Sequence, residues 1–181
     1  MADTVATSRA YWRLAEETML DQDFADVKVL AVWVHGPGVI HSKTPIRNVE
    51  DLNGVKLRAP TQVTNQMFSS LGATAVGMPV PAVPEALSKG VINATVIPWD
   101  VTTPLKTNEL VHNHTEFGDN ALYTATFMIA MNRGKYDSLP DDLKAVIAQT
   151  RAWFFQNSLP TRVSKPISPL GPLRLRWAIT S

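Results

Sequence analysis

Four side chains in this sequence have the chemistry of anion recognition, and each stands where a β-strand is expected to end or a helix to begin. Arg58 comes late in one expected strand, and Trp99 and His35 each follow another. Thr61 opens the helix after Arg58, and helix N-termini favour anions. Because open α/β sheets bind ligands at the carboxyl ends of their strands, and a guanidinium matches a carboxylate, the set predicts a site for a small anion with an apolar part.

Three of these side chains also have an ordinary structural interpretation. An arginine late in a strand is more often a surface residue. A tryptophan that follows a proline is more often a packing anchor. His35 stands beside glycines and fits a polar loop residue.

The sequence contains few of the residue patterns that enzymes use for catalysis. The chain has no cysteine, no Gly-x-Ser-x-Gly turn and no glycine-rich phosphate loop. His112, His114 and Glu116 have the two-residue spacing that places ligands on one face of a strand, but a further protein ligand is missing. The sequence therefore predicts no catalytic residue, no metal site and no cofactor.

The elements that would position these residues alternate along the chain. Apolar runs predict strands, and amphipathic or capped stretches predict helices. The expected strands are 27–34, 55–59, 74–78, 91–97 and 121–131, and the expected helices are 5–20, 61–71, 85–89 and 138–150. The glycines and proline at 35–38 predict a loop. This alternation predicts an α/β fold with a mostly parallel sheet and helices on its faces.

Composition and charge narrow the class of partner. The chain has 181 residues, 45% of them hydrophobic, and no apolar run reaches the roughly 18 residues of a membrane span. Five of the 17 Lys and Arg residues lie in 151–181, which holds no acid, so residues 1–150 carry 12 basic and 16 acidic groups. A mildly acidic body argues against nucleic acid as a partner.

Three ordered blocks resemble the solute-binding proteins of TRAP transporters, the DctP-like family. Residues 50–60 (EDLNGVKLRAP) resemble the family signature dLkGlKiRvp, and the likeness continues through 71–74. Residues 78–93 (MPVPAVPEALSKGVIN) and 136–144 (YDSLPDDLK) resemble two later family segments. The resemblance covers about residues 5–150.

The resemblance implies a periplasmic-binding-protein-like architecture of two α/β lobes that close around a ligand. It implies that Arg58 holds the carboxylate of a small organic acid, with Thr61, Val80 and the segment Ile97-Pro98-Trp99 lining the cleft. It further implies a periplasmic receptor that passes its ligand to TRAP membrane subunits and touches the membrane only through them.

Three departures from the family pattern favour a monocarboxylate with an apolar body. The loop that begins at His35 lacks the second arginine that some members carry there. Val80 and Ile97 replace an aromatic residue and a polar asparagine of the family, and Trp99 is the candidate for the missing aromatic wall.

The resemblance also predicts a division of the chain. We expect a remnant of the first lobe at 1–34, the second lobe with Arg58 at 35–122, a return strand and helix of the first lobe at 123–150, and an atypical basic, proline-rich tail at 151–181. Family members begin with a signal peptide and about a hundred or more further residues. Met1 therefore resembles an internal start, and the tail resembles a misjoined gene end.

Two other interpretations stay open at the level of sequence. One is a cytoplasmic α/β enzyme acting on a small organic acid, with His35 or the pair His112 and His114 as its base. The other is a non-functional gene fragment that keeps only the fold.

Overall fold

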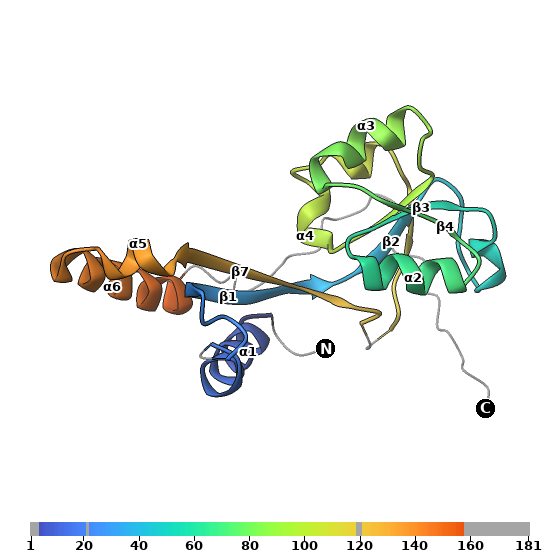
Figure 1. Ribbon diagram of the computed structural model, residues 1–181. Helices are drawn as coiled ribbons and strands as arrows, with labels where there is room; N and C mark the ends of the chain where they lie inside the picture. The colour runs from blue at the N-terminus through green and yellow to red at the C-terminus, as the bar shows by residue number, and fades with distance from the viewer. Residues whose placement is uncertain (1–3, 21, 119–120, 158–181) are drawn as a thin grey trace. The chain divides into compact units, whose positions relative to one another are not determined.

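The computed structural model describes residues 4–20, 22–118 and 121–157, with side chains up to residue 151. Among these, residues 36–124 form one compact unit, and residues 4–35 together with 125–157 form a second (Figure 1). From residue 158 onward the predicted tail lies outside the described residues. The assignment of the two units to lobes, with the boundaries given above, remains a prediction.

The unit of residues 36–124 is built on a five-stranded sheet in the order β4-β3-β5-β2-β6. The strands are β2 (Val39–Ser42), β3 (Lys56–Ala59), β4 (Thr74–Gly77), β5 (Ala94–Ile97) and β6 (Asn113–Thr115). β3 runs parallel to β4 and β5, whereas β2 runs antiparallel to β5 and β6. β3, β4, β5 and β6 therefore share one direction, as the predicted mostly parallel sheet requires, and only β2, a short strand that the sequence did not reveal, runs against them.

Helices cover both faces of this sheet (Figure 1). On one face, Phe68 of α2 (Gln62–Ser70) packs with Leu57, Val96 and Ile40 in the largest apolar core. On the other, α3 (Val83–Ser88) contributes Leu87 to a smaller core. The remaining helices of this unit are α4 (Trp99–Thr102) and the 3-10 turns η1 (Glu50–Leu52), η2 (Val80–Ala82) and η3 (Thr107–Glu109).

The first strand of the chain is longer than predicted. β1 spans Val27–Pro37, so the expected loop at 35–38 is wrong up to Pro37. Gly38 instead allows a close approach, since its N–H donates to the Tyr123 carbonyl oxygen at 3.0 Å, and a Cβ at Gly38 would overlap the Tyr123 ring. Among the described residues the glycines of this stretch keep ordinary φ values. Gly38 therefore serves close packing and not a left-handed turn.

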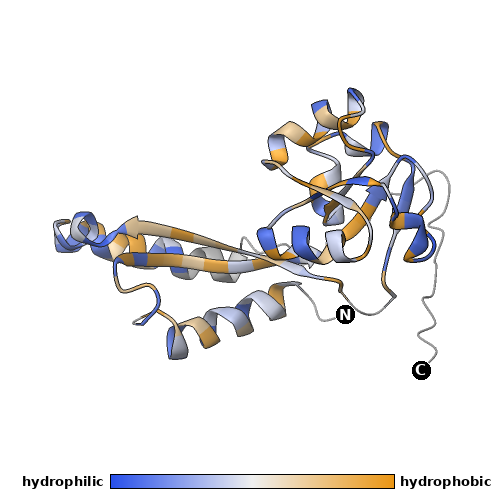
Figure 2. Cartoon of the chain, turned by 45° about the vertical axis from the view of Figure 1, so that its right-hand side comes forward, coloured by the Kyte–Doolittle hydropathy of each residue, from blue (hydrophilic) through white to orange (hydrophobic). Residues whose placement is uncertain are grey.

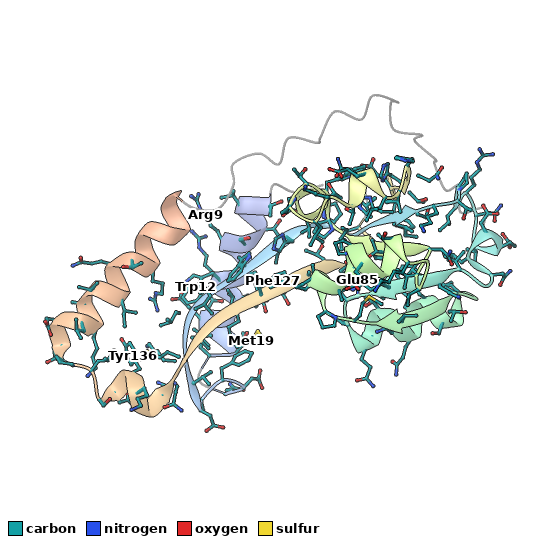
Figure 3. All side chains as sticks on the ribbon, turned by 90° about the horizontal axis from the view of Figure 1, so that it is seen from above. Arg9, Trp12, Met19, Glu85, Phe127 and Tyr136 are labelled. Carbon is teal, nitrogen blue, oxygen red and sulfur yellow. The ribbon has the colours of Figure 1, made fainter. Side chains whose placement is uncertain are left out.

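The second unit pairs β1 with β7 (Thr124–Asn132) in a two-stranded sheet, with apolar residues along both strands (Figure 2). Its helices are α1 (Thr4–Thr18), α5 (Arg133–Asp137) and α6 (Asp141–Asn157). Ala15 packs with Val29 and Val32 in its core. Tyr136 of α5 lies beside Lys28 of β1, with Nζ 5.0 Å from the ring centroid (Figure 3).

Most other elements fall where the sequence placed them. The helix predicted to end at residue 150 continues to Asn157, so the first residues of the predicted tail are helical. Over the described ranges, no helix combines the length and the apolar character that crossing a bilayer requires.

Candidate functional site

One row of polar side chains crosses the five-stranded sheet. Arg58 of β3 pairs in register with Thr95 of β5, Thr95 pairs with His41 of β2, and His41 pairs with His114 of β6. Partners in register direct their side chains to the same face of a sheet. The row therefore lies on the face opposite the main apolar core and begins at Arg58.

Arg58 is a buried cation with few partners. Only 3% of the residue is exposed, Nε donates to the Met78 carbonyl oxygen at 3.1 Å, and Nη1 donates to the Val96 carbonyl oxygen at 3.4 Å. Three of the five N–H donors of its guanidinium have no partner in the described part of the chain, and no carboxylate there pairs with it. Burial lowers the pKa of Arg58, yet a guanidinium stays charged at neutral pH. Since an unpaired buried charge is costly, the site is suited to an incoming anion.

Tyr123 shares an acceptor with Arg58. Its hydroxyl donates to the same Val96 carbonyl oxygen at 3.2 Å. Burial raises the pKa of Tyr123 to about 12, with the Arg58 charge opposing the shift, so the phenol stays a neutral donor. Thr95, next in the row, has a buried Oγ1 without a partner among the described residues. Buried polar atoms of this kind are satisfied by water or by a ligand.

Trp99 is held by three neighbours at the far end of the row. Its Nε1 donates to Oε1 of Glu116 at 2.8 Å. Its ring centroid lies 4.9 Å from that of His41, edge to face at 87°, and 4.7 Å from that of His114. Trp99 thus packs on the same face of the sheet that carries Arg58.

The two histidines bond directly to each other. Their Nδ1 atoms are 2.8 Å apart, and Nε2 of His41 lies 3.1 Å from the Ile97 carbonyl oxygen. A carbonyl only accepts, so His41 carries its proton on Nε2 and its Nδ1 accepts from His114. Burial, followed by repulsion from His114, lowers the pKa of His41 to about 3. Burial also lowers the pKa of His114, with His112 adding to the shift and Glu116 opposing it.

The other predicted site residues occupy less informative places. Thr61 is the exposed N-cap of α2, and its hydroxyl and N–H both serve a capping box with Thr64. Val80 begins η2 and is half-buried, whereas Ile97 and Pro98 are buried at the end of β5. The roles of these residues in ligand binding remain predictions.

His35 belongs to the other unit. Its ring contacts Phe127 there, with the centroids 4.7 Å apart. Its proposed part in ligand binding likewise remains a prediction.

Sequence reasoning missed Tyr123, His41 and the role of Glu116. The two-residue spacing from His112 to Glu116 is compatible with a strand, although none was predicted there, and β6 forms at its centre. Across the described ranges, no three His, Cys, Asp or Glu side chains converge as metal ligands would.

Comparison with protein families gives a match along most of the chain. The model of the bacterial extracellular solute-binding protein family 7 matches residues 1–153. Among curated proteins, the outer membrane transporter protein TsaT of Comamonas testosteroni is 30% identical over 144 residues. The C4-dicarboxylate-binding periplasmic protein DctP of Rhodobacter capsulatus is 27% identical over 129 residues. These alignments take in 77% and 68% of this chain but only 42% and 36% of the relatives.

Solved structures agree with this match. A TRAP solute-binding protein from Rhodoferax ferrireducens, in complex with copurified benzoate, is 46% identical with a TM-score of 0.75. A marine metagenome TRAP solute-binding protein specific for aromatic acid ligands, in complex with metahydroxyphenylacetate, is 46% identical with a TM-score of 0.77. Each alignment takes in 86% of this chain and about half of the other, 51% and 50%.

Proposed function

We propose, from the premise that this chain belongs to the bacterial extracellular solute-binding proteins of family 7, that it binds a small aromatic monocarboxylate through Arg58. The family consists of solute-binding proteins and not of enzymes, in agreement with the prediction from the sequence. The mixed α/β fold matches about half of the two-lobe TRAP binding-protein chains, as predicted. The chain spans 36–51% of the relatives reported above, so its ligand and its partners belong to this proposal.

The burial of Arg58 without a counter-charge is the observation that carries the proposal. A side chain that is 3% exposed and faces no described carboxylate has a charge that folding alone does not neutralise. A carboxylate would accept two parallel N–H bonds from the guanidinium and cancel its charge. Exclusion of water around the bound pair would strengthen the attraction.

The apolar surroundings support a ligand with one charge. Ile97, Pro98 and Trp99 follow one another at the end of β5, beside the Val96 carbonyl that Arg58 contacts. These groups offer carbon surface and no second cation. The two solved relatives at 46% identity are described with benzoate and with aromatic acid ligands, which supports the same class of ligand here.

The physiological role follows from the family. We propose that the ligand is captured outside the cytoplasm, in the periplasm, and is passed to the membrane subunits of a TRAP-type transporter. The curated DctP relative is a periplasmic binding protein, which supports this location.

A thermal-shift panel tests the ligand class. Benzoate, propionate, succinate and gluconate are each added to the chain at increasing concentration. At 100 times its Kd a ligand stabilises a protein by about 2.7 kcal/mol. We expect benzoate to raise the Tm most and the dianion and the sugar acid to raise it least. A larger shift with succinate than with benzoate would contradict the proposed monocarboxylate.

A further inference from the structure

We infer that Glu116, together with the histidine pair of His41 and His114, positions the Trp99 indole as a fixed wall of the ligand site and so sets a preference for aromatic acids. This inference rests on the proposed function, because it assigns these residues to the same site as Arg58. It brings into the ligand site Glu116, His41 and His114, none of which was assigned a part in ligand binding from the sequence.

The sheet places Trp99 within reach of a ligand on Arg58. β3 and β2 are separated only by β5, so their axes lie about 10 Å apart. The Arg58 guanidinium already extends over β5, since Nη1 reaches the Val96 carbonyl oxygen. Trp99 follows β5 after one proline and contacts His41 of β2 on the same face. A carboxylate attached to one aromatic ring can bridge the remaining span.

Three separate contacts restrict the orientation of the indole. The bond to Glu116 fixes the direction of its N–H, and the rings of His41 and His114 lie beside it at interplanar angles of 87° and 52°. The His41 ring is fixed in turn by the Ile97 carbonyl oxygen, which lies two residues before Trp99. The wall is therefore preorganised, and a ligand need not order it on binding.

The same contacts determine which groups of the Trp99 indole remain available to a ligand. The only hydrogen-bond donor of an indole is its N–H, and in Trp99 that donor is engaged by Glu116. The surface left for a ligand is aromatic carbon, which favours offset or edge-to-face contact with another ring. An aromatic acid gains from such a wall, whereas a short aliphatic acid gains little.

Two substitutions of Glu116 separate positioning from general stability. Glu116→Gln keeps an oxygen that accepts from the indole, whereas Glu116→Leu removes it. We expect the Gln variant to bind benzoate within about twofold of the parent. We expect the Leu variant to bind benzoate about threefold to tenfold more weakly and propionate as the parent does. The Kd values come from calorimetry, and the Tm of each ligand-free variant shows that it is folded.

A spectroscopic probe reports on Trp99 directly. The chain has five tryptophans, so incorporation of 5-fluorotryptophan gives several fluorine resonances, and Trp99→Phe identifies the one from Trp99. We expect benzoate to shift that resonance in the parent. In the absence of ligand, we expect Glu116→Leu to shift or broaden it and Glu116→Gln to leave it unchanged.

The outcomes distinguish the two proposals. If benzoate binds the parent but leaves the Trp99 resonance unchanged, the wall is wrong and the carboxylate site stands. Equal benzoate affinities in the Leu and Gln variants would overturn the role of Glu116. If no acid binds the parent, the proposed function itself fails.

Discussion

At the scale of the residue, the informative feature is a charge without a partner. Burying a charge without a counter-charge costs several kcal/mol per ion, and proteins keep such charges where function needs them. Arg58 is 3% exposed and bonds only to two carbonyl oxygens among the described residues. Replacing Arg58 should therefore weaken ligand binding while leaving the stability of the ligand-free protein unchanged or higher.

We expect Arg58→Met to unfold, without ligand, at the same or a higher urea concentration than the parent. The gain in free energy of unfolding should lie between zero and about 4 kcal/mol, because an unpaired buried charge is removed. Arg47→Met, at an exposed arginine, is the control and should change little. A loss of more than about 3 kcal/mol would show that Arg58 mainly holds the fold.

The histidine pair predicts a dependence of stability on pH. His41 has a pKa of about 3 in the folded chain and about 6.5 when unfolded. Between these values the unfolded state binds the extra proton, so the contribution of His41 is complete above pH 6.5 and is lost as the pH falls toward 3. The loss amounts to about 1.4 kcal/mol per pH unit.

Urea unfolding between pH 7 and pH 4 measures this effect. We expect His41→Gln to remove about one proton from the slope of stability against pH. His112→Gln, at an exposed histidine, should change the slope far less, because His112 acts only by adding to the shift of the His114 pKa. Identical slopes in the parent and His41→Gln would contradict the neutral, buried state of His41.

At the scale of the element, close packing between residues far apart in the sequence, and not the local composition, determines where β1 ends. The run of Gly36, Pro37 and Gly38 has the composition of a loop, yet β1 continues to Pro37 and β2 begins at Val39. The glycine at 38 is required because the Tyr123 ring occupies the place of its side chain. Tyr123 is 85 residues away in the sequence, so no local pattern could predict the contact.

We expect Gly38→Ala to destabilise the protein by about 1–3 kcal/mol, as overpacking of a filled space does. The displaced Tyr123 ring would also lose its bond to Val96 beside Arg58, so benzoate should bind more weakly. Gly36→Ala is a matched control, since its Cβ would meet only the Pro98 Cβ at 4.0 Å. Chemical denaturation of both variants checks the prediction, and equal stabilities would refute it.

What could be predicted from the sequence follows the same difference between local signals and long-range packing. The elements β3, α2, β4, α3 and β5 were all predicted, because each has an apolar run or a capped helix bounded by glycine or proline. β2 and β6 are four and three residues long and owe their strand conformation to pairing with β5 and with each other. The sequence proposed Arg58 and Trp99 by their positions, but His41 and His114, which contact Trp99, lie on those unpredicted strands, and Glu116 directly follows one of them.

At the scale of the whole molecule, the second unit exposes apolar side chains. Phe127, Met128 and Ile129 of β7 are 41–46% exposed, and Leu143 and Val146 of α6 are 46% and 55% exposed. Large apolar side chains that stay exposed favour association. The pairing of β1 with β7 leaves β7 largely uncovered.

We expect the chain to associate with itself as its concentration rises. Ile129→Lys should weaken the association, because it places a charge in the exposed strand. Val63→Lys, at an exposed residue of α2 in the other unit, is the control and should leave the association unchanged. Sedimentation velocity over a range of concentrations gives the result, and a monomer at every concentration would contradict the expectation.

Titration calorimetry of benzoate into the parent, Arg58→Met and Arg47→Met addresses the proposed receptor function most directly. A carboxylate receptor that works through its buried arginine should give saturable binding to the parent and to Arg47→Met, and no measurable binding to Arg58→Met. Benzoate binding of equal strength in all three proteins would contradict the assignment of the carboxylate to Arg58.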